Sequence, residues 1–344
     1  MSQNSTHHYT RASVLSVERV EAPVRVTSAE IDDRLTDVYR RTRMRGGLLE
    51  SLVGIRERRW WGEGEDDADF VAGAAAAGQA ALAASRVPAE RIGLMVNTSL
   101  SRHWLEPATA VVIHDRIGLP TSCQNFDTTN ACLGFMNGIE IAATMIETGM
   151  IDYALVVDAE DSRPVSESTI ERLSNDVSTS RDVMSEFAAL TLGSGAVAMV
   201  LGPAEDHPEG HRVVAAVSRA GTEHHELCVG DNESMVTDLK GLLEAGLDLS
   251  DALWTEAARA HGWDGGMDRY VIHQVSQVHT DALCDRLGID KERVPRTFPE
   301  YGNIGPASVP FTLAGEAGSL ASGDRVLLMG IGSGLNACVL ELAW

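Results

Sequence analysis

A Gly-Ser-Gly turn followed by an apolar run occurs twice in this chain of 344 residues, at 192–200 and again at 331–339. The apolar runs that precede the two turns are also spaced alike. They lie 59 residues apart in the first copy, from Val96 to Leu155, and 55 residues apart in the second. A repeat of this length indicates a duplicated domain and not a solenoid of many small units.

Unbroken apolar runs alternate with stretches of helical spacing in both copies. Runs such as 92–98 and 153–158 lack the alternation of a half-exposed strand, so we predict strands of a sheet that is covered on both faces. The alanine-rich stretch 70–85 is one of the predicted helices. Together these patterns predict an α/β fold with an N-terminal half at 1–205 and a C-terminal half at 206–344.

Three further segments of the first half have distinct sequence patterns. Residues 1–10 are predicted to be a disordered lead-in, and 31–43 a helix capped by Ser28. The polar segment 161–186 has no counterpart in the second half. It is either an excursion over the active site or a dimer interface, or else a plain surface loop.

The composition is that of a globular protein, with 44% hydrophobic and 23% charged residues. No run is long enough to span a bilayer, and the polar start lacks a signal-peptide core, so a cytoplasmic protein without a membrane span is expected. The cysteines are scattered and form no CxxC pair, which predicts free thiols and neither a disulfide framework nor a metal site. They are Cys123, Cys132, Cys228, Cys284 and Cys338.

The formal net charge is −22, from 50 acidic and 28 basic residues, so nucleic acid is not expected as a partner. A ligand that carries phosphate groups would need a local basic patch. The densest basic segments are 40–45 and 56–59. Each is either such a patch or solvated surface.

Cys132 lies between a polar turn and an apolar helix within the stretch 125–140. Thr128, Thr129 and Asn130 are residues that cap helices, so Cys132 is predicted in the first helical turn. The positive end of the helix dipole would then lower the pKa of the thiol and favour a nucleophilic thiolate. The alternative is a small buried cysteine that packs as an apolar residue.

Two more polar residues interrupt apolar surroundings at comparable places. His273 ends a predicted buried strand, and Asn303 stands in a glycine-rich turn. Strand ends that face helix starts are where α/β sheets place their chemistry. Each residue alone could be a buried histidine or a turn asparagine, whereas Cys132, His273 and Asn303 together fit acyl-thioester chemistry.

The chain resembles the thiolase superfamily, in its branch of ketoacyl synthase III enzymes, over about residues 28–344. Within that branch it is most similar to OleA-type enzymes, which join two fatty acyl-CoA molecules head to head. The motifs that carry the resemblance are Asn130-Ala131-Cys132-Leu133-Gly134-Phe135, His273-Gln274, Gly302-Asn303-Ile304-Gly305-Pro306, Asn97-Thr98-Ser99, Trp104-Leu105-Glu106-Pro107 and Gly330-Ile331-Gly332-Ser333-Gly334.

The resemblance implies a thiolase fold, five-layered αβαβα, a homodimer, and acylation of Cys132 with His273 and Asn303 at the catalytic centre. It also implies that Glu106 removes an α-proton in the neighbouring subunit's site. Without the resemblance, Glu106 would only be an acid that favours the start of a helix at Pro107.

The implied reaction is a Claisen condensation without decarboxylation. Cys132 takes the first acyl group, and backbone amides of Cys132 and of Ser333-Gly334 are candidates for the oxyanion hole. The carbanion of a second acyl chain then attacks, with His273 and Asn303 stabilising the enolate. The product is a β-ketoacyl thioester or a β-keto acid for later enzymes, in lipid metabolism such as olefin or β-lactone biosynthesis. Coenzyme A is part of the substrate, so no separate cofactor is expected.

Some positions depart from the malonyl-dependent synthases of the same branch. Ser276 stands where those enzymes have asparagine, and Leu48 and Leu52 replace the residues that clamp the coenzyme A adenine. The residues that bind the nucleotide therefore stay unknown. Alternatives are a decarboxylative 3-oxoacyl-carrier-protein synthase III, acyl transfer to an alcohol or amine, and an inactive partner subunit.

Overall fold

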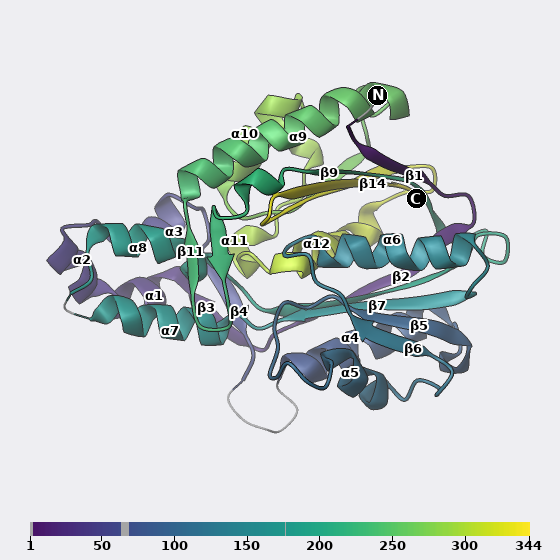
Figure 1. Cartoon of the computed structure of the whole chain (residues 1–344), viewed down its shortest axis with the longest axis horizontal. Helices are drawn as coiled ribbons and strands as arrows, with labels where there is room; N and C mark the ends of the chain where they lie inside the picture. Colours follow the sequence, from purple (N-terminus) through teal and green to yellow (C-terminus); the bar gives the residue numbers. More distant parts are fainter. Residues whose placement is uncertain (1–2, 63–68, 176) are drawn as a thin grey trace.

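The computed structural model describes residues 3–62, 69–175 and 177–344. Among the described residues, one ten-stranded sheet forms two stacked β-layers, with one helical layer between them and one on each outer side, which gives five layers, αβαβα (Figure 1). This arrangement confirms the predicted fold class.

The strand order repeats between the halves, as expected of a duplication. The first half has the order β6-β5-β7-β8-β2 and the second the order β12-β13-β14-β9, and β2 pairs with β9 at Ser13–Arg212 and Val14–His211. The pairing also repeats. In the first half β5-β7 is parallel, and β7-β8 and β8-β2 are antiparallel; in the second half β12-β13 is parallel, and β13-β14 and β14-β9 are antiparallel. The strands are β2 (Ala12–Glu21), β5 (Ile92–Asn97), β6 (Gln124–Asp127), β7 (Tyr153–Glu160), β8 (Gly195–Pro203), β9 (His211–Ala220), β12 (Arg269–Ile272), β13 (Arg325–Gly332) and β14 (Asn336–Ala343).

Each helical layer has its own apolar core. The central layer buries side chains against both sheets, which explains why the strands are apolar on both faces. Gly73 shows how closely the outer layer packs, since an added Cβ would lie 2.2 Å from the Trp61 ring. The outer helices are α4 (Phe70–Ser85) and α5 (Thr109–Ile117) on one side and α9 (Leu239–His261) and α10 (Gln277–Leu287) on the other, with α6 (Gly134–Glu147) and α12 (Ser308–Glu316) in the centre.

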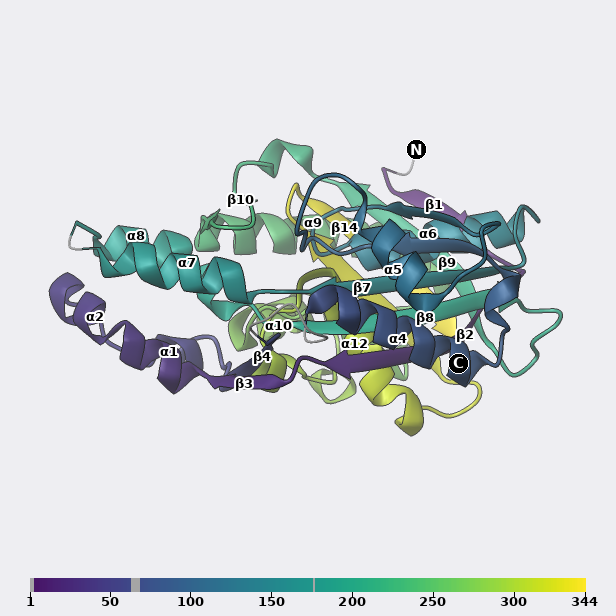
Figure 2. The same ribbon diagram turned by 90° about the horizontal axis from the view of Figure 1, so that it is seen from below.

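A side lobe extends from one end of the layers (Figure 2). The polar segment 161–186 belongs to it, and most of its described residues form two helices, in which Ile170, Leu173 and Val183 are buried in a cluster with Ile31 and Leu35. The lobe contains α1 (Ser28–Arg34), α2 (Thr36–Thr42), α3 (Leu48–Ser51), α7 (Arg163–Ser174), α8 (Ser180–Glu186), β3 (Val24–Thr27) and β4 (Glu57–Trp60).

Two predictions for the first half are wrong. The lead-in forms strand β1 (Ser5–His8), which pairs with β9 through backbone groups although its side chains are exposed. The cap of α1 is Thr27, whose side chain accepts from Glu30 N, while Ser28 Oγ donates to Ile55 O over 2.5 Å. A helix long and apolar enough to cross a membrane is absent from the described ranges.

Candidate active site

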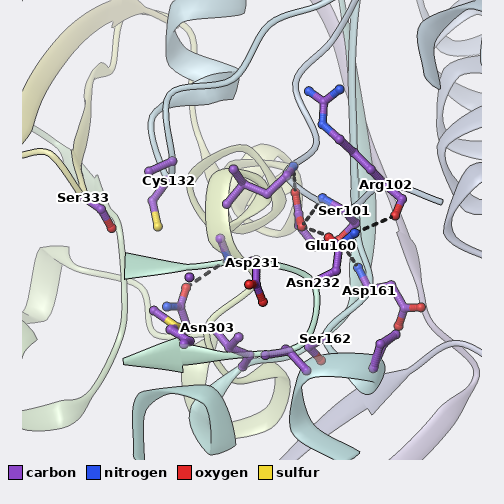
Figure 3. A pocket seen from close by; sticks show the side chains of 18 of the residues that line it. Ser101, Arg102, Cys132, Glu160, Asp161, Ser162, Asp231, Asn232, Asn303 and Ser333 are labelled. Carbon is purple, nitrogen blue, oxygen red and sulfur yellow. Dashed lines mark hydrogen bonds between the residues drawn. The ribbon is translucent and has the colours of Figure 1, made fainter. Parts of the chain in front are cut away.

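A cavity of about 610 Å³ lies between the two halves, at the carboxyl ends of β5 and β7. Cys132 and Ser333 are on one side of it, and Ser101, Glu160 and Asp161 are on the other (Figure 3). A hairpin of β10 (Cys228–Gly230) and β11 (Met235–Thr237) contributes a further wall. The volume of the cavity is within the usual range for small-molecule sites.

Cys132 precedes α6 rather than lying within its first turn. The helix begins at Gly134, and the preceding turn places Ala131 at a φ of 44°. Gly134 is required there, because an added Cβ would lie 2.7 Å from Thr98 O. The turn therefore brings Cys132 into the cavity next to β5.

The turn at Gly332–Gly334 lies against the backbone of Cys132. An added Cβ on Gly332 would be 3.3 Å from Cys132 N, and Gly334 has a φ of 140°, a conformation that favours glycine. Ser333, Gly334 and Cys132 line the same cavity, as expected of the proposed oxyanion donors.

Asn303 lines this cavity from the second half of the chain. Its backbone is fixed by hydrogen bonds from Asn303 N to Thr191 O and from Gly193 N to Asn303 O, of 3.0 and 2.8 Å. Its Oδ1 accepts from Gly305 N over 3.0 Å, which leaves Nδ2 as the donor for a ligand.

His273 is 3% exposed and lines a second, smaller cavity with Trp254, Gly330 and Ile331. It is not one of the described residues that line the larger cavity. Burial, and to a lesser degree the nearby His279, lower the pKa of His273 to about 3, so its imidazole is neutral. Its Nδ1 has no hydrogen-bond partner among the described residues.

Glu106 is exposed, on the loop between β5 and α5, and lines neither of these cavities. Of the four catalytic residues that the sequence predicts, the structure thus brings Cys132 and Asn303 into one cavity. His273 lines the second cavity instead, and Glu106 lines neither.

The expected lowering of the Cys132 pKa is wrong. Burial raises the pKa of this thiol to about 12, and the neighbouring Cys228, Glu160 and Asp158 act in the same direction. The sequence shows the helix start but not the acids around the thiol. Deprotonation must therefore accompany its attack on a substrate.

Three acids at the end of β7 were not predicted as site residues. Asp158 is fully buried beside Thr98, whose Oγ1 is 2.5 Å from Asp158 Oδ2. Burial raises the pKa of Glu160 to about 7, and it also raises the pKa values of Asp158 and Asp161. A cluster of acids that ends an apolar run is the signal in the sequence that could have revealed them.

Neither basic segment lines the cavity. Within 56–59, Arg56 pairs with Glu300, Arg59 pairs with Glu57, and the buried Arg58 donates to Leu190 O. Arg41, in the other segment, donates to Leu173 O in the side lobe. The cations of the cavity wall are instead Arg102 and, when protonated, His103 and His225.

Comparisons with known proteins show the family to which the chain belongs. The family model of 3-oxoacyl-[acyl-carrier-protein] synthase III matches residues 126–221, and the model of its C-terminal part matches 259–344. The acyl-CoA:acyl-CoA alkyltransferase of Xanthomonas campestris is 42% identical, over 98% of this chain and 99% of its own. The chain belongs to the OleA family of condensing enzymes. As a member, it is an acyltransferase with a thiolase-like fold.

Other OleA-family comparisons give the same assignment. The acyl-CoA:acyl-CoA alkyltransferase of Shewanella oneidensis is 34% identical, over 98% of this chain and 99% of its own. A crystal structure of Xanthomonas campestris OleA with bound lauric acid and lauroyl-CoA has a TM-score of 0.94, covering 98% of this chain and 100% of that one.

The boundary predicted between residues 205 and 206 lies between β8 and β9 and stays a prediction.

Proposed function

We propose that the chain condenses two fatty acyl-CoA molecules without decarboxylation, through an acyl group held on Cys132. The observation that carries this proposal is the cavity in which the Cys132 thiol, the Ser333-Gly334 turn and Asn303 meet. A thioester carbonyl bound there would meet the Cys132 thiol as nucleophile and, next to it, the backbone amides of Cys132 and of the Ser333-Gly334 turn as donors. The names of the OleA-family relatives support acyl-CoA as the substrate class.

His273 would act as a neutral hydrogen-bond donor beside Asn303. An imidazole with a pKa of about 3 stays uncharged at neutral pH, so it can stabilise an enolate oxygen without an ion pair in the ground state. Ser276, whose side chain accepts from His279 N and caps α10, stands where malonyl-dependent synthases have asparagine, and this difference supports a reaction without malonyl substrates.

The base for the second acyl chain would be Glu106 of a partner subunit. Glu106 stands beside Leu105, which is 90% exposed, and Leu100, Trp104, Val111 and Phe126 are further exposed apolar side chains on this loop, on α5 and on β6. Strand β6, at the edge of its sheet, holds Phe126. Exposed apolar side chains and a strand at the sheet edge support a homodimer, in which Glu106 would be covered together with Leu105.

The product would be a β-ketoacyl thioester or a β-keto acid, for an enzyme that reduces or otherwise consumes such compounds, as in olefin or β-lactone biosynthesis. The five cysteines are free thiols in the structure, which supports a reducing compartment such as the cytoplasm.

The test is mass spectrometry of the protein and its products after incubation with acyl-CoA of graded chain length. We expect one acyl mass on Cys132, followed by a product that keeps all carbons of both acyl chains. A product formed only with a malonyl thioester, with loss of carbon dioxide, would contradict the proposal. Acyl transfer to an added alcohol or amine without carbon–carbon bond formation would contradict it as well.

A further inference from the structure

Glu160 holds the start of the loop that carries Glu106. We call residues 100–107 the base loop. Leu100 N donates to Glu160 Oε1 over 2.7 Å, while Ser101 N and Ser101 Oγ donate to Oε2 over 3.2 and 2.7 Å. The carboxylate therefore receives three hydrogen bonds from two successive residues of this loop.

The attachment runs in both directions and has a counterpart just beyond the far end of the loop. Ser101 Oγ accepts from Asp161 N over 2.7 Å. Asp127 accepts from Thr109 N and Ala110 N over 2.9 and 2.8 Å, and it pairs with Arg102. The start of the base loop and the start of α5, which follows it, are thus fixed by buried or partly buried acids, and the exposed part between them presents Glu106.

Glu160 also belongs to the wall of the cavity in its own chain. It is 8% exposed and lines the cavity with Cys132 and Asn303. An added Cβ on Gly305 would lie 3.6 Å from Glu160 Cγ. The Glu160 side chain therefore packs against Gly305, in the turn that holds Asn303. One carboxylate thus joins the cavity of a chain to the loop that this chain offers its partner (Figure 3).

Its hydrogen bonds make Glu160 better suited to hold a loop than to remove a proton. Burial raises the pKa of Glu160, but both of its oxygens already accept hydrogen bonds from the base loop. A base for an α-proton needs a free oxygen that faces the substrate.

We propose that Glu160 is a positioning residue, which fixes the base loop of its own chain so that Glu106 acts in the partner subunit's cavity. The proposal rests on the proposed function, in which Glu106 serves the partner. Under this proposal, Glu160 of one chain mainly affects the condensation that takes place in the cavity of the partner subunit.

Dimers with two different affinity tags test this proposal. One chain carries Cys132→Ala, so that only the cavity of the other chain can be acylated. Glu160→Gln is then placed either on the Cys132→Ala chain, whose Glu106 serves the working cavity, or on the chain that keeps Cys132. Glutamine keeps the size of the side chain but replaces one acceptor oxygen by an NH₂ group that cannot accept from the loop.

We expect condensation to fall about tenfold further in the first placement than in the second, since a small displacement of a catalytic group has effects of this size or larger. Acylation of Cys132 should be unchanged in the first placement, where the cavity that is acylated keeps its own Glu160, and a general folding defect would not produce this result. Ser101→Ala removes one donor from the loop side and should show the same preference with a smaller loss. Equal losses in the two placements, or a larger loss when the change is on the chain that keeps Cys132, would overturn the proposal.

Glu106→Ala in the same two placements is the matched control for the underlying function. If Glu106→Ala abolishes condensation only when it is placed on the Cys132→Ala chain, Glu106 acts in the partner subunit's cavity. The Glu160→Gln result then tests the positioning role alone. If it abolishes condensation only on the chain that keeps Cys132, the shared site itself is wrong, and the positioning role in this form fails with it.

Discussion

Asn336 Nδ2 donates a hydrogen bond to Asn130 Oδ1 over 3.3 Å and so connects the two halves of the chain beside the nucleophile. Asn130 Nδ2 donates in turn to Asn137 Oδ1 over 2.8 Å, and Asn137 Nδ2 donates to Glu140 Oε2 over 2.9 Å. This series of side chains links the start of β14, just after the Gly332–Gly334 turn, to helix α6. It holds the Gly332–Gly334 turn, which carries the proposed oxyanion donor, in place beside Cys132.

Asn336→Ala should therefore slow the acylation of Cys132 by about tenfold. The change removes one hydrogen bond, worth about 1 kcal/mol, and loosens a donor whose full loss would cost about 3 kcal/mol. Rapid-quench mass spectrometry of the acyl-enzyme measures the rate. Ser333→Ala is the control, and it should lose less because the expected donor is a backbone amide. A larger loss in Ser333→Ala would assign the role to the hydroxyl.

Cys132→Ala should abolish the acyl adduct, whereas Cys228→Ala should keep it. Both cysteines line the cavity, but only Cys132 lies against the Gly332–Gly334 turn. Peptide mapping after incubation with acyl-CoA locates the adduct. An adduct on Cys228, Cys123 or Cys284 in the wild-type protein would show that the nucleophile is misassigned.

Mixing Cys132→Ala subunits with Glu106→Ala subunits should restore condensation to about a quarter of the wild-type level. Random exchange makes half of the dimers mixed, and each mixed dimer has one complete site of two. Glu106→Ala alone should still become acylated on Cys132. Absence of recovery, with subunit exchange verified by the tags, would mean that Glu106 serves its own chain.

Stability should fall as the pH rises from about 5 to 8, and Glu160 should account for part of this fall. Its pKa of about 7 is above the ordinary glutamate value, so the folded chain keeps a proton that the unfolded chain releases in this window. Burying the ionised form then costs stability above pH 7. Glu160→Gln should reduce the fall by roughly 2 kcal/mol, measured by chemical denaturation at both pH values. The exposed Glu205→Gln is the control, and an unchanged pH dependence in Glu160→Gln would contradict the pKa.

Much of this architecture could be predicted because it depends on apolar patterns and on glycine. The two Gly-Ser-Gly runs revealed the duplication, and the unbroken apolar strands revealed a sheet covered on both faces. The Cys132 turn, Asn303 and Ser333-Gly334 were expected together at strand ends, and one cavity holds them. Their catalytic roles stay predictions.

What could not be predicted depends on contacts between distant segments. Strand β1 has four exposed side chains and pairs only through its backbone, so it leaves no apolar pattern. The direction of the Cys132 pKa shift depends on burial and on acids that other segments bring near. The role of Glu160 needs residues 100 and 101, which are about sixty positions away in the sequence.

The acids around the cavity also affect how fast a substrate arrives. Glu160, Asp161 and Asp231 line it, with Arg102 as the constant cation of the same wall, and the whole chain has a net charge of −22. Coenzyme A esters are polyanions, so the long-range field of the protein slows their approach. Added salt shortens the range of this repulsion, to about 10 Å at 0.1 M ionic strength. For this chain, moderate ionic strength should therefore speed the encounter with acyl-CoA, opposite to the behaviour of enzymes that attract their substrates electrostatically.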